Sequence, residues 1–236
     1  MYYKNKISEL KKIFGNSVKI QDNELIIFDQ VYEVINDVIV LDSSYRDEKK
    51  KNILESFQDE WFEFSRITKE HYDEFNLYFD LIDINILKDK TICDFGCGIG
   101  RWSKILIDRV NLKNLILFDY SDAIFIAREN FKEYDNVIFI KCDIEKIPFK
   151  KGSIDFFYCL GVLHHLPNKK SIAIEKIKNC SKEGIIYLYY AIDSKSITFQ
   201  TLFNLADILR KFLSKIKNQS IKIRISYFLV IFTYYP

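Results

Sequence analysis

The sequence lacks a marked excess of charge, a leader-like start and a long apolar run. Its 35 Lys and Arg residues face 33 Asp and Glu, which leaves a net charge of +2. Composition therefore gives no electrostatic reason to expect a nucleic-acid partner. No charged segment followed by an apolar one opens the chain, and the longest apolar run, residues 225–235, is well short of the roughly 18–20 residues that cross a bilayer. We expect neither secretion nor a membrane span.

The chain is also poor in metal-ligand pairs. Cys93 and Cys97 have a spacing that could suggest a metal site, but no second Cys or His pair lies near them. The number of cysteines is odd, and they are spread along the chain at Cys93, Cys97, Cys142, Cys159 and Cys180. We expect reduced thiols in a cytoplasmic protein and no metal.

What the sequence does contain is enough apolar residues for one sizeable core, with 48% apolar and 29% charged residues in a chain of 236. Its pattern divides it into four segments. Residues 1–50 hold three short β-branched runs and predict a small β-rich element, and residues 51–88 predict a helical entry segment. Residues 89–191 form the main domain, and residues 192–236 carry a helical apolar stripe. The chain stops directly after an apolar run, which we interpret as truncation.

Within the main domain, short apolar runs alternate with helical patterns. The runs predict five strands, at residues 91–95, 114–119, 136–140, 154–160 and 184–190. Strands that alternate with helices are typical of an α/β fold with a doubly wound, Rossmann-like, mostly parallel sheet and flanking helices.

The stretch "DFGCGIGR" follows the first of these strands. Its glycines let the backbone approach a ligand at the start of the next helix, but their Gly-x-Gly-x-Gly spacing is not the dinucleotide fingerprint. Asp94 stands just before them, where a pyrophosphate would feel its charge. Two unit charges about 4 Å apart interact by roughly 4 kcal/mol at an effective dielectric near 20. A cationic ligand is therefore favoured, and S-adenosylmethionine has a sulfonium, an ammonium and no phosphate.

Two further acids end the next two strands. Asp119 ends the second strand, where a carboxylate can accept both hydroxyls of a ribose, a feature shared with NAD enzymes. Asp143 follows the third strand, where it could accept the amino group of an adenine. Each could singly be a turn residue, but together with the glycine loop they favour a nucleoside cofactor.

The ordered series "DFGCGIGR", "LILFDYS" and "KCDIEKIPFKKGSIDFFYCLGVLHHLPN" resembles the class I S-adenosylmethionine-dependent methyltransferases of the type 11 group, over about residues 90–190. The resemblance implies that the loop holds the methionine part, Asp119 the ribose and Asp143 the adenine, and that two residues after the fourth strand line the methyl-donor side. The implied cofactor-binding residues are Asp94, Gly96, Cys97, Gly98, Gly100, Asp119, Tyr120, Asp143, Ile144, Leu160 and Gly161.

The chain departs from this family because no sixth or seventh strand is visible, which leaves the fifth as an edge and puts activity of this piece in doubt. Residues 1–45 faintly resemble a zinc-ribbon-like module without its metal cysteines. Residues 203–236 weakly resemble an insertion in methyltransferases of bacterial sugar and polysaccharide clusters. The expected acceptor is therefore a small molecule, possibly a sugar or a polysaccharide precursor.

Catalytic roles are less determined by the sequence. His164 and His165 follow the fourth strand, where one could take a proton from the acceptor, or both could be structural. Proximity could supply much of the rate without a base. Trp61 either covers the cofactor or packs the entry segment. An NAD-dependent oxidoreductase and a non-catalytic cofactor-binding or interaction module are the alternative functions, and the acceptor and the oligomeric state stay open.

Overall fold

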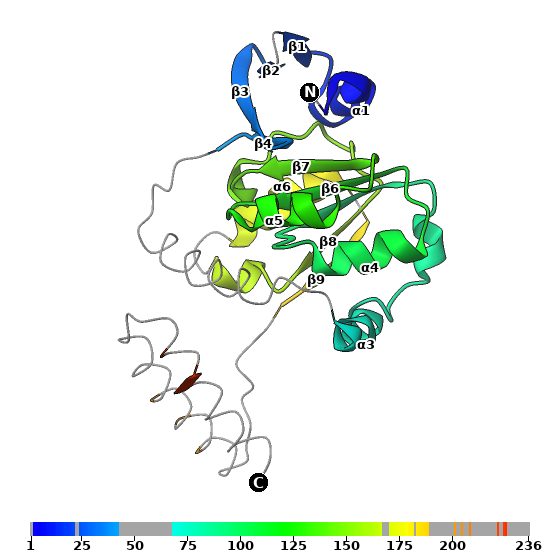
Figure 1. The fold of residues 1–236 in the computed structure, drawn as a ribbon, viewed down its shortest axis with the longest axis vertical. Helices are drawn as coiled ribbons and strands as arrows, with labels where there is room; N and C mark the ends of the chain where they lie inside the picture. The colour runs from blue at the N-terminus through cyan, green and yellow to red at the C-terminus, as the bar shows by residue number, and fades with distance from the viewer. Residues whose placement is uncertain are drawn as a thin grey trace. The chain divides into compact units, whose positions relative to one another are not determined.

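The computed structural model describes residues 2–21, 24–42, 68–166, 170–181 and 183–188, and the helical positions 201, 204, 208, 221, 224 and 225 (Figure 1). The chain divides into two compact units, Met1–Tyr189 and Tyr190–Pro236. Most of the predicted C-terminal helical segment and the stretch around Trp61 lie outside the described residues. None of the described helices has the length and apolarity that a bilayer crossing needs.

The first unit is built on one sheet with the strand order β1-β2-β3-β4-β7-β6-β5-β8-β9. Its core is five parallel strands. The apolar runs of β5 to β8 are buried on both faces, as strands covered by helices require, whereas β9 is partly exposed. The doubly wound α/β fold is therefore confirmed. The core strands are β5 (Thr91–Phe95), β6 (Asn114–Asp119), β7 (Val137–Lys141), β8 (Phe156–Leu160) and β9 (Gly184–Tyr187).

The N-terminal strands extend this sheet. They form an antiparallel meander, and its last strand pairs in parallel with β7, with Val38 opposite Phe139. Asn36 and Asp37, which form the turn before that strand, both have positive φ, as a tight hairpin turn demands. The strands are β1 (Lys19–Gln21), β2 (Glu24–Ile27), β3 (Gln30–Ile35) and β4 (Val38–Val40), and they follow η1 (Lys4–Lys6) and α1 (Ile7–Phe14).

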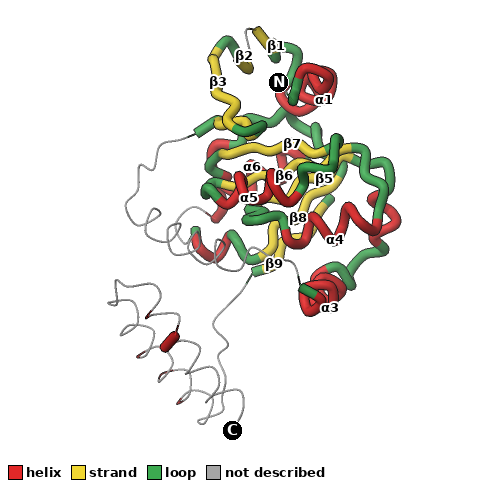
Figure 2. Tube along the Cα trace, viewed as in Figure 1, coloured by secondary structure: helices red, strands yellow, loops and turns green. Residues whose placement is uncertain are grey.

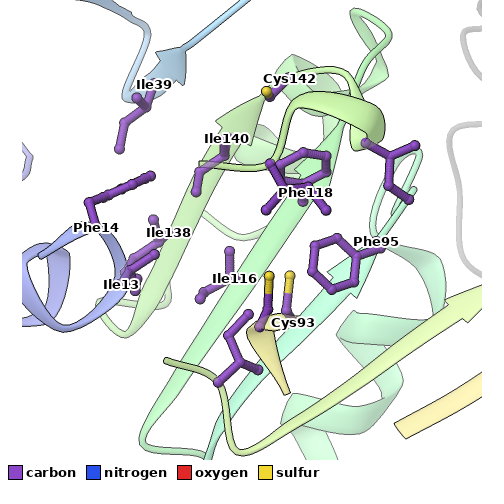
Figure 3. Close-up of a cluster of buried hydrophobic side chains, with 14 of the residues drawn as sticks. Ile13, Phe14, Ile39, Cys93, Phe95, Ile116, Phe118, Ile138, Ile140 and Cys142 are labelled. Carbon is purple, nitrogen blue, oxygen red and sulfur yellow. The ribbon is translucent and has the colours of Figure 1, made fainter. Parts of the chain in front are cut away.

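Helices cover both faces of the sheet (Figure 2). One face carries α3 (Lys69–Tyr78), α4 (Arg101–Arg109) and α5 (Ala123–Asn130), and the other carries α1 and α6 (Lys170–Cys180). Successive side chains of a strand point to opposite faces, so each strand contributes to both cores. Figure 3 shows the core on the face that carries α1 and α6, in which Ile13 and Phe14 of α1 lie beside Ile116 of β6 and Ile138 of β7.

Residues near the N-terminus tie β4 to the sheet. The Tyr3 side chain is fully buried, and its hydroxyl donates to the Asp37 carbonyl at 2.7 Å and accepts the Phe139 N–H at 3.1 Å. The Asp37 carboxylate in turn pairs with the Arg128 guanidinium of α5 at 2.7 Å. The meander is therefore joined to the main sheet by buried hydrogen bonds as well as by strand pairing.

Candidate functional site

The glycine loop begins directly after β5 and depends on the absence of side chains. Gly96 and Gly100 have φ of +81° and +78°, which L side chains rarely adopt. A Cβ atom at Gly96 would lie 2.3 Å from Val162 Cγ2, and one at Gly100 would lie 2.6 Å from Phe131 Cε2. Only glycine lets the loop pack this closely under the segment that follows β8.

Hydrogen bonds fix the loop to the neighbouring strand. The Gly96 N–H donates to the Phe118 carbonyl of β6 at 2.7 Å, and the Gly98 N–H donates to Asp119 Oδ2 at 2.7 Å. The loop ends at Gly100, the N-cap of α4, where the first N–H groups of a helix have no partner within the helix. The loop thus brings backbone donors and the start of a helix to one point at the carboxyl edge of the sheet.

Asp119 ends β6 and braces this loop. Besides the Gly98 N–H, its carboxylate accepts the Ser121 N–H and hydroxyl, both at 2.7 Å on Oδ1. Burial raises the pKa of Asp119, and these hydrogen bonds oppose that rise. The Tyr120 N–H also bonds to Asp119 and lowers its pKa. A carboxylate has about four acceptor positions, so a ribose hydroxyl could bond to Asp119 only where one of these protein donors moves aside.

Asp94 differs from Asp119 in how few donors it receives. It is 3% exposed, and Ser103 Oγ donates to its Oδ2 at 2.7 Å. In the described part of the chain, no hydrogen bond reaches Oδ1. Burial, with the negative charge of Asp119, raises the pKa of Asp94 to about 7. A buried carboxylate with a free oxygen favours a ligand that brings a positive charge or a donor.

The third predicted acid, Asp143, lies at the adjoining strand end. Its Oδ1 accepts the Glu145 N–H at 3.0 Å and so caps the short helix η3 (Ile144–Lys146). The Cys142 N–H bonds the Asp119 carbonyl at 2.9 Å, which holds the ends of β6 and β7 together. Asp143 and Ile144 are each 7% exposed and Tyr120 is half-buried. Their contact with an adenine stays a prediction.

The segment after β8 closes over the loop. Gly161 has φ +71° and donates its N–H to the Tyr187 carbonyl of β9 at 3.0 Å. His164 and His165 lie in the short helix η4 (Leu163–His165), with ring centroids 3.9 Å apart. Burial lowers the pKa of both rings, so both are neutral near pH 7 and can accept a proton. Their catalytic role stays a prediction.

An aromatic group that the sequence analysis missed lies beside the loop. Trp102, in the first turn of α4, has its ring centroid 5.1 Å from Tyr78 of α3, and Tyr78 lies 5.0 Å from Tyr187 of β9. His71 lies 6.0 Å from Trp102, and its Nδ1 accepts the Thr68 N–H at 2.8 Å, which puts the ring proton on Nε2. The position of Trp102 just after the glycines was the available signal.

The carboxyl edge of the sheet is rich in acids. Of its bases, Lys141 pairs with Asp122 and Lys146 pairs with Asp42. Six acids lie at or just after the carboxyl ends of β4, β5, β6 and β7: Asp42, Asp94, Asp119, Asp122, Asp143 and Glu145. This balance favours a cationic ligand over a polyphosphate. Among the described residues, no three His, Cys, Asp or Glu come together in a way that could hold a metal ion.

The core of the sheet is similar to known proteins. Residues 92–184 match the model of a family described as a methyltransferase domain. This match runs from β5 to the start of β9. It includes the glycine loop, the strand-end acids Asp94, Asp119 and Asp143, and the histidine pair.

Curated relatives match over short stretches. An uncharacterised chloroplastic methyltransferase of Arabidopsis thaliana is 29% identical over 42% of this chain and 29% of its own length. A malonyl-[acyl-carrier protein] O-methyltransferase of Coxiella burnetii is 32% identical over 31% of this chain and 29% of its own length. A tRNA U34 carboxymethyltransferase of Nautilia profundicola is 36% identical over 35% of this chain and 28% of its own length. The chain thus spans less than a third of the length of each.

Among solved structures, a phosphoethanolamine N-methyltransferase of Haemonchus contortus, in complex with phosphoethanolamine and S-adenosylhomocysteine, superposes with a TM-score of 0.47 at 15% identity. That match covers 62% of this chain and 33% of the other.

Proposed function

We propose that the chain binds S-adenosylmethionine at the carboxyl edge of its sheet and transfers the methyl group to a small molecule. The match of residues 92–184 to a methyltransferase domain and the resemblance to the class I, S-adenosylmethionine-dependent enzymes support this proposal. The observation that carries this proposal is the convergence of the glycine loop with Asp94 and Asp119 at one point of that edge. In a doubly wound sheet, this is where ligands bind.

The residues present fit such a cofactor. The loop has no side chains at Gly96, Gly98 and Gly100, so the backbone can approach the methionine part closely. Asp94 offers Oδ1 to an ammonium group, and Asp119 offers a ribose hydroxyl an acceptor when one of its protein donors moves aside. The cofactor, when bound, supplies a methyl group made electrophilic by the positive sulfur.

The chain's own contribution to the reaction is placement. Leu160 ends β8, Gly161 follows it, and Val162 packs against the glycine loop. An acceptor held by these three residues would lie beside the methyl donor. Either neutral histidine, His164 or His165, could take the proton that the acceptor loses. In-line placement itself contributes much of the rate in reactions of this kind.

A small acceptor is favoured over RNA by the charge of the edge. The acids around Asp94, Asp119 and Asp143 would repel a phosphate backbone, and the net charge of +2 offers no compensating basic excess. Some relatives are named for tRNA or for an acyl-carrier protein, so the acceptor class rests on this electrostatic argument alone. The narrower proposal of a sugar or polysaccharide precursor rests on residues 203–236, which lie almost entirely outside the described residues.

Calorimetric titration of the chain with S-adenosylhomocysteine and, separately, with NAD tests the cofactor. We expect the first to bind and the second not to bind. Asp119→Asn should weaken S-adenosylhomocysteine at least about tenfold, because a charged acceptor for the ribose and the brace on Gly98 are both lost. Asp108→Asn is the matched control, since Asp108 lies on α4 and pairs with Lys104 at 2.8 Å, away from the loop.

Binding of NAD alone would replace this proposal with the oxidoreductase. Equal affinities of the two Asp→Asn variants would show that Asp119 does not contact the cofactor. An unfolding curve of Asp119→Asn that matches the original protein is needed to separate lost binding from lost structure.

A further inference from the structure

We propose that Tyr158, Ser103 and Asp94 form a hydrogen-bonded chain that positions Asp94 as the acceptor of the cofactor's ammonium group, and that binding there releases a proton. The inference rests on the proposed function, since it presumes a ligand with an ammonium group. Tyr158 and Ser103 are positioning residues in this scheme, because they act through Asp94.

The three side chains come from three elements and meet inside the protein. Asp94 is in β5, Tyr158 lies opposite it in β8, and Ser103 is in α4. Ser103 and Tyr158 are fully buried. Ser103 Oγ lies 2.7 Å from Asp94 Oδ2 and 2.5 Å from the Tyr158 hydroxyl oxygen.

The chemistry of the groups fixes the direction of the chain. An ionised carboxylate only accepts, so Ser103 must donate its single proton to Asp94. Ser103 Oγ is then the acceptor for the proton of Tyr158. The Tyr158 hydroxyl also lies close enough to Asp94 to lower the pKa of that carboxyl directly. Hydrogen bonds arranged in one direction polarise one another and strengthen the last acceptor. The chain therefore holds Oδ2 and stabilises the ionised form, while Oδ1 receives no donor from the described residues.

Among the residues that the structure describes, none adds a positive charge that lowers the pKa of Asp94. The thiol of Cys97 in the loop lies on the same face of the sheet as Asp94, and those of Cys93 and Cys159 lie on the opposite face. Burial raises the pKa values of all three thiols, so these stay neutral. From β6, Asp94 faces the carboxylate of Asp119.

The cations in the first turn of α4 are directed elsewhere. The Arg101 guanidinium lies over the Trp102 ring at 5.8 Å, and Lys104 pairs with Asp108. Burial and the negative charge of Asp119 therefore act together, and the pKa of Asp94 rises to about 7. A bound ammonium group would reverse this, because an opposite charge at short range favours the carboxylate.

The proton balance follows from this geometry. In the free protein near pH 7, part of the molecules carry Asp94 as the neutral acid. When the ammonium group binds, the acid gives up its proton to the solvent and the carboxylate and ammonium pair. Affinity should then rise about tenfold per pH unit well below pH 7 and level off above it.

Calorimetric titration with S-adenosylhomocysteine at pH 6, 7 and 8, in buffers with different heats of ionisation, measures the released protons directly. We expect release of about 0.9 proton per ligand at pH 6 and about 0.1 at pH 8. Asp94→Asn should bind more weakly, release no proton, and show an affinity that is flat in pH.

Tyr158→Phe and Ser103→Ala test the chain itself. Each removes support for the ionised form, so the pH at which affinity levels off should move upward, further for Ser103→Ala, which loses the direct donor. Tyr134→Phe is the control, because that hydroxyl bonds Lys104 and Asp108 near the surface and should leave the pH profile unchanged.

The outcomes separate this inference from the proposed function. Tight binding with no proton release, or an unchanged pH profile in Tyr158→Phe and Ser103→Ala, overturns the hydrogen-bonded chain while the cofactor assignment stands. Absence of S-adenosylhomocysteine binding at every pH overturns the proposed function, and the inference with it.

Discussion

At the scale of residues, Asp94 and Asp119 are both buried beside the glycine loop but differ in their hydrogen bonds. Asp119 receives donors from Gly98, Tyr120 and Ser121, whereas Asp94 is supported by the hydroxyls of Ser103 and Tyr158 and by no backbone N–H of the described residues. Burial without donors disfavours a charged carboxylate, so the two groups respond differently to pH although they are neighbours. The number of hydrogen-bond donors therefore decides that Asp94 is the carboxyl group with a pKa near 7.

The raised pKa of Asp94 predicts a pH dependence of stability. The folded protein holds this proton up to about pH 7, whereas the unfolded chain loses it near pH 4. Between these values the unfolded chain binds fewer protons, so the free energy of unfolding should fall as pH rises. We expect a decline on the order of 2–4 kcal/mol between pH 4 and pH 8, relative to Asp94→Asn. Denaturant unfolding of both proteins across this range measures it.

The comparison with Asp94→Asn removes the contribution of all other titrating groups. Asp108→Asn serves as control, because it should run parallel to the original protein. If Asp94→Asn also runs parallel, the carboxyl is ionised in the folded protein at neutral pH.

The sequence identified the acids but not the hydroxyls that bond to them. Asp94 and Asp119 follow from their place at strand ends. Tyr158 lies in the middle of the run "FFYCL", where a tyrosine is read as part of an apolar strand. Only the strand order, which places β8 beside β5, shows that its hydroxyl faces Asp94 through Ser103. Pairing between distant segments is invisible to a periodicity argument.

At the scale of elements, the glycine loop combines backbone strain with close packing. Gly96→Ala should destabilise the protein by roughly 2–4 kcal/mol, from about 1–2 kcal/mol for the positive φ and a similar amount for the contact with Val162. Thermal or denaturant unfolding measures the total.

Two variants separate these contributions. Gly152 also has positive φ, +66°, but nothing lies within 4 Å of its added Cβ, so Gly152→Ala should show the backbone cost alone. Combining Gly96→Ala with Val162→Ala should recover part of the steric cost. Equal losses in Gly96→Ala and Gly152→Ala would mean that Val162 yields freely.

The Tyr3 hydroxyl is one of the contacts that join the N-terminal meander to β7. Tyr3→Phe should lower stability by about 1–3 kcal/mol, because the Phe139 N–H and the Asp37 carbonyl lose a buried partner. Chemical denaturation checks it. Tyr32→Phe is the control, since that hydroxyl bonds only Gln30 at the surface, and a similar loss in both variants would contradict the role given to Tyr3.

The strands themselves were predictable, but their joining was not. The three β-branched runs of the first 50 residues, at 24–28, 31–35 and 38–42, correspond to β2, β3 and β4 because β-branched residues and turn pairs are local signals. The parallel pairing of β4 with β7 depends on contacts across the whole chain, and nothing within the first 50 residues specifies it.

At the scale of the whole molecule, residues 2–42 belong to the same compact unit as the methyltransferase core. This predicts that β4 opens only when the core opens. The Leu41 amide, which donates to the Lys141 carbonyl at 2.9 Å, should exchange its hydrogen with the same free energy of opening as Ile116 in the middle of the sheet. Native-state hydrogen exchange measures both.

Ile20 of β1, the edge strand, should exchange more readily than either amide, which gives an internal reference. If Leu41 exchanges as fast as Ile20, the meander opens independently of the core and is a separate folding unit.

The Tyr3 contact also has a consequence for the order of synthesis. Tyr3 is synthesised 136 residues before its partner Phe139. The meander can form its own hairpins early, but its place on the sheet does not exist until β7 has been translated. Residues 2–42 are thus made before the strand they pair with, and the nascent chain must keep the apolar side of α1 and β4 from other partners during that interval.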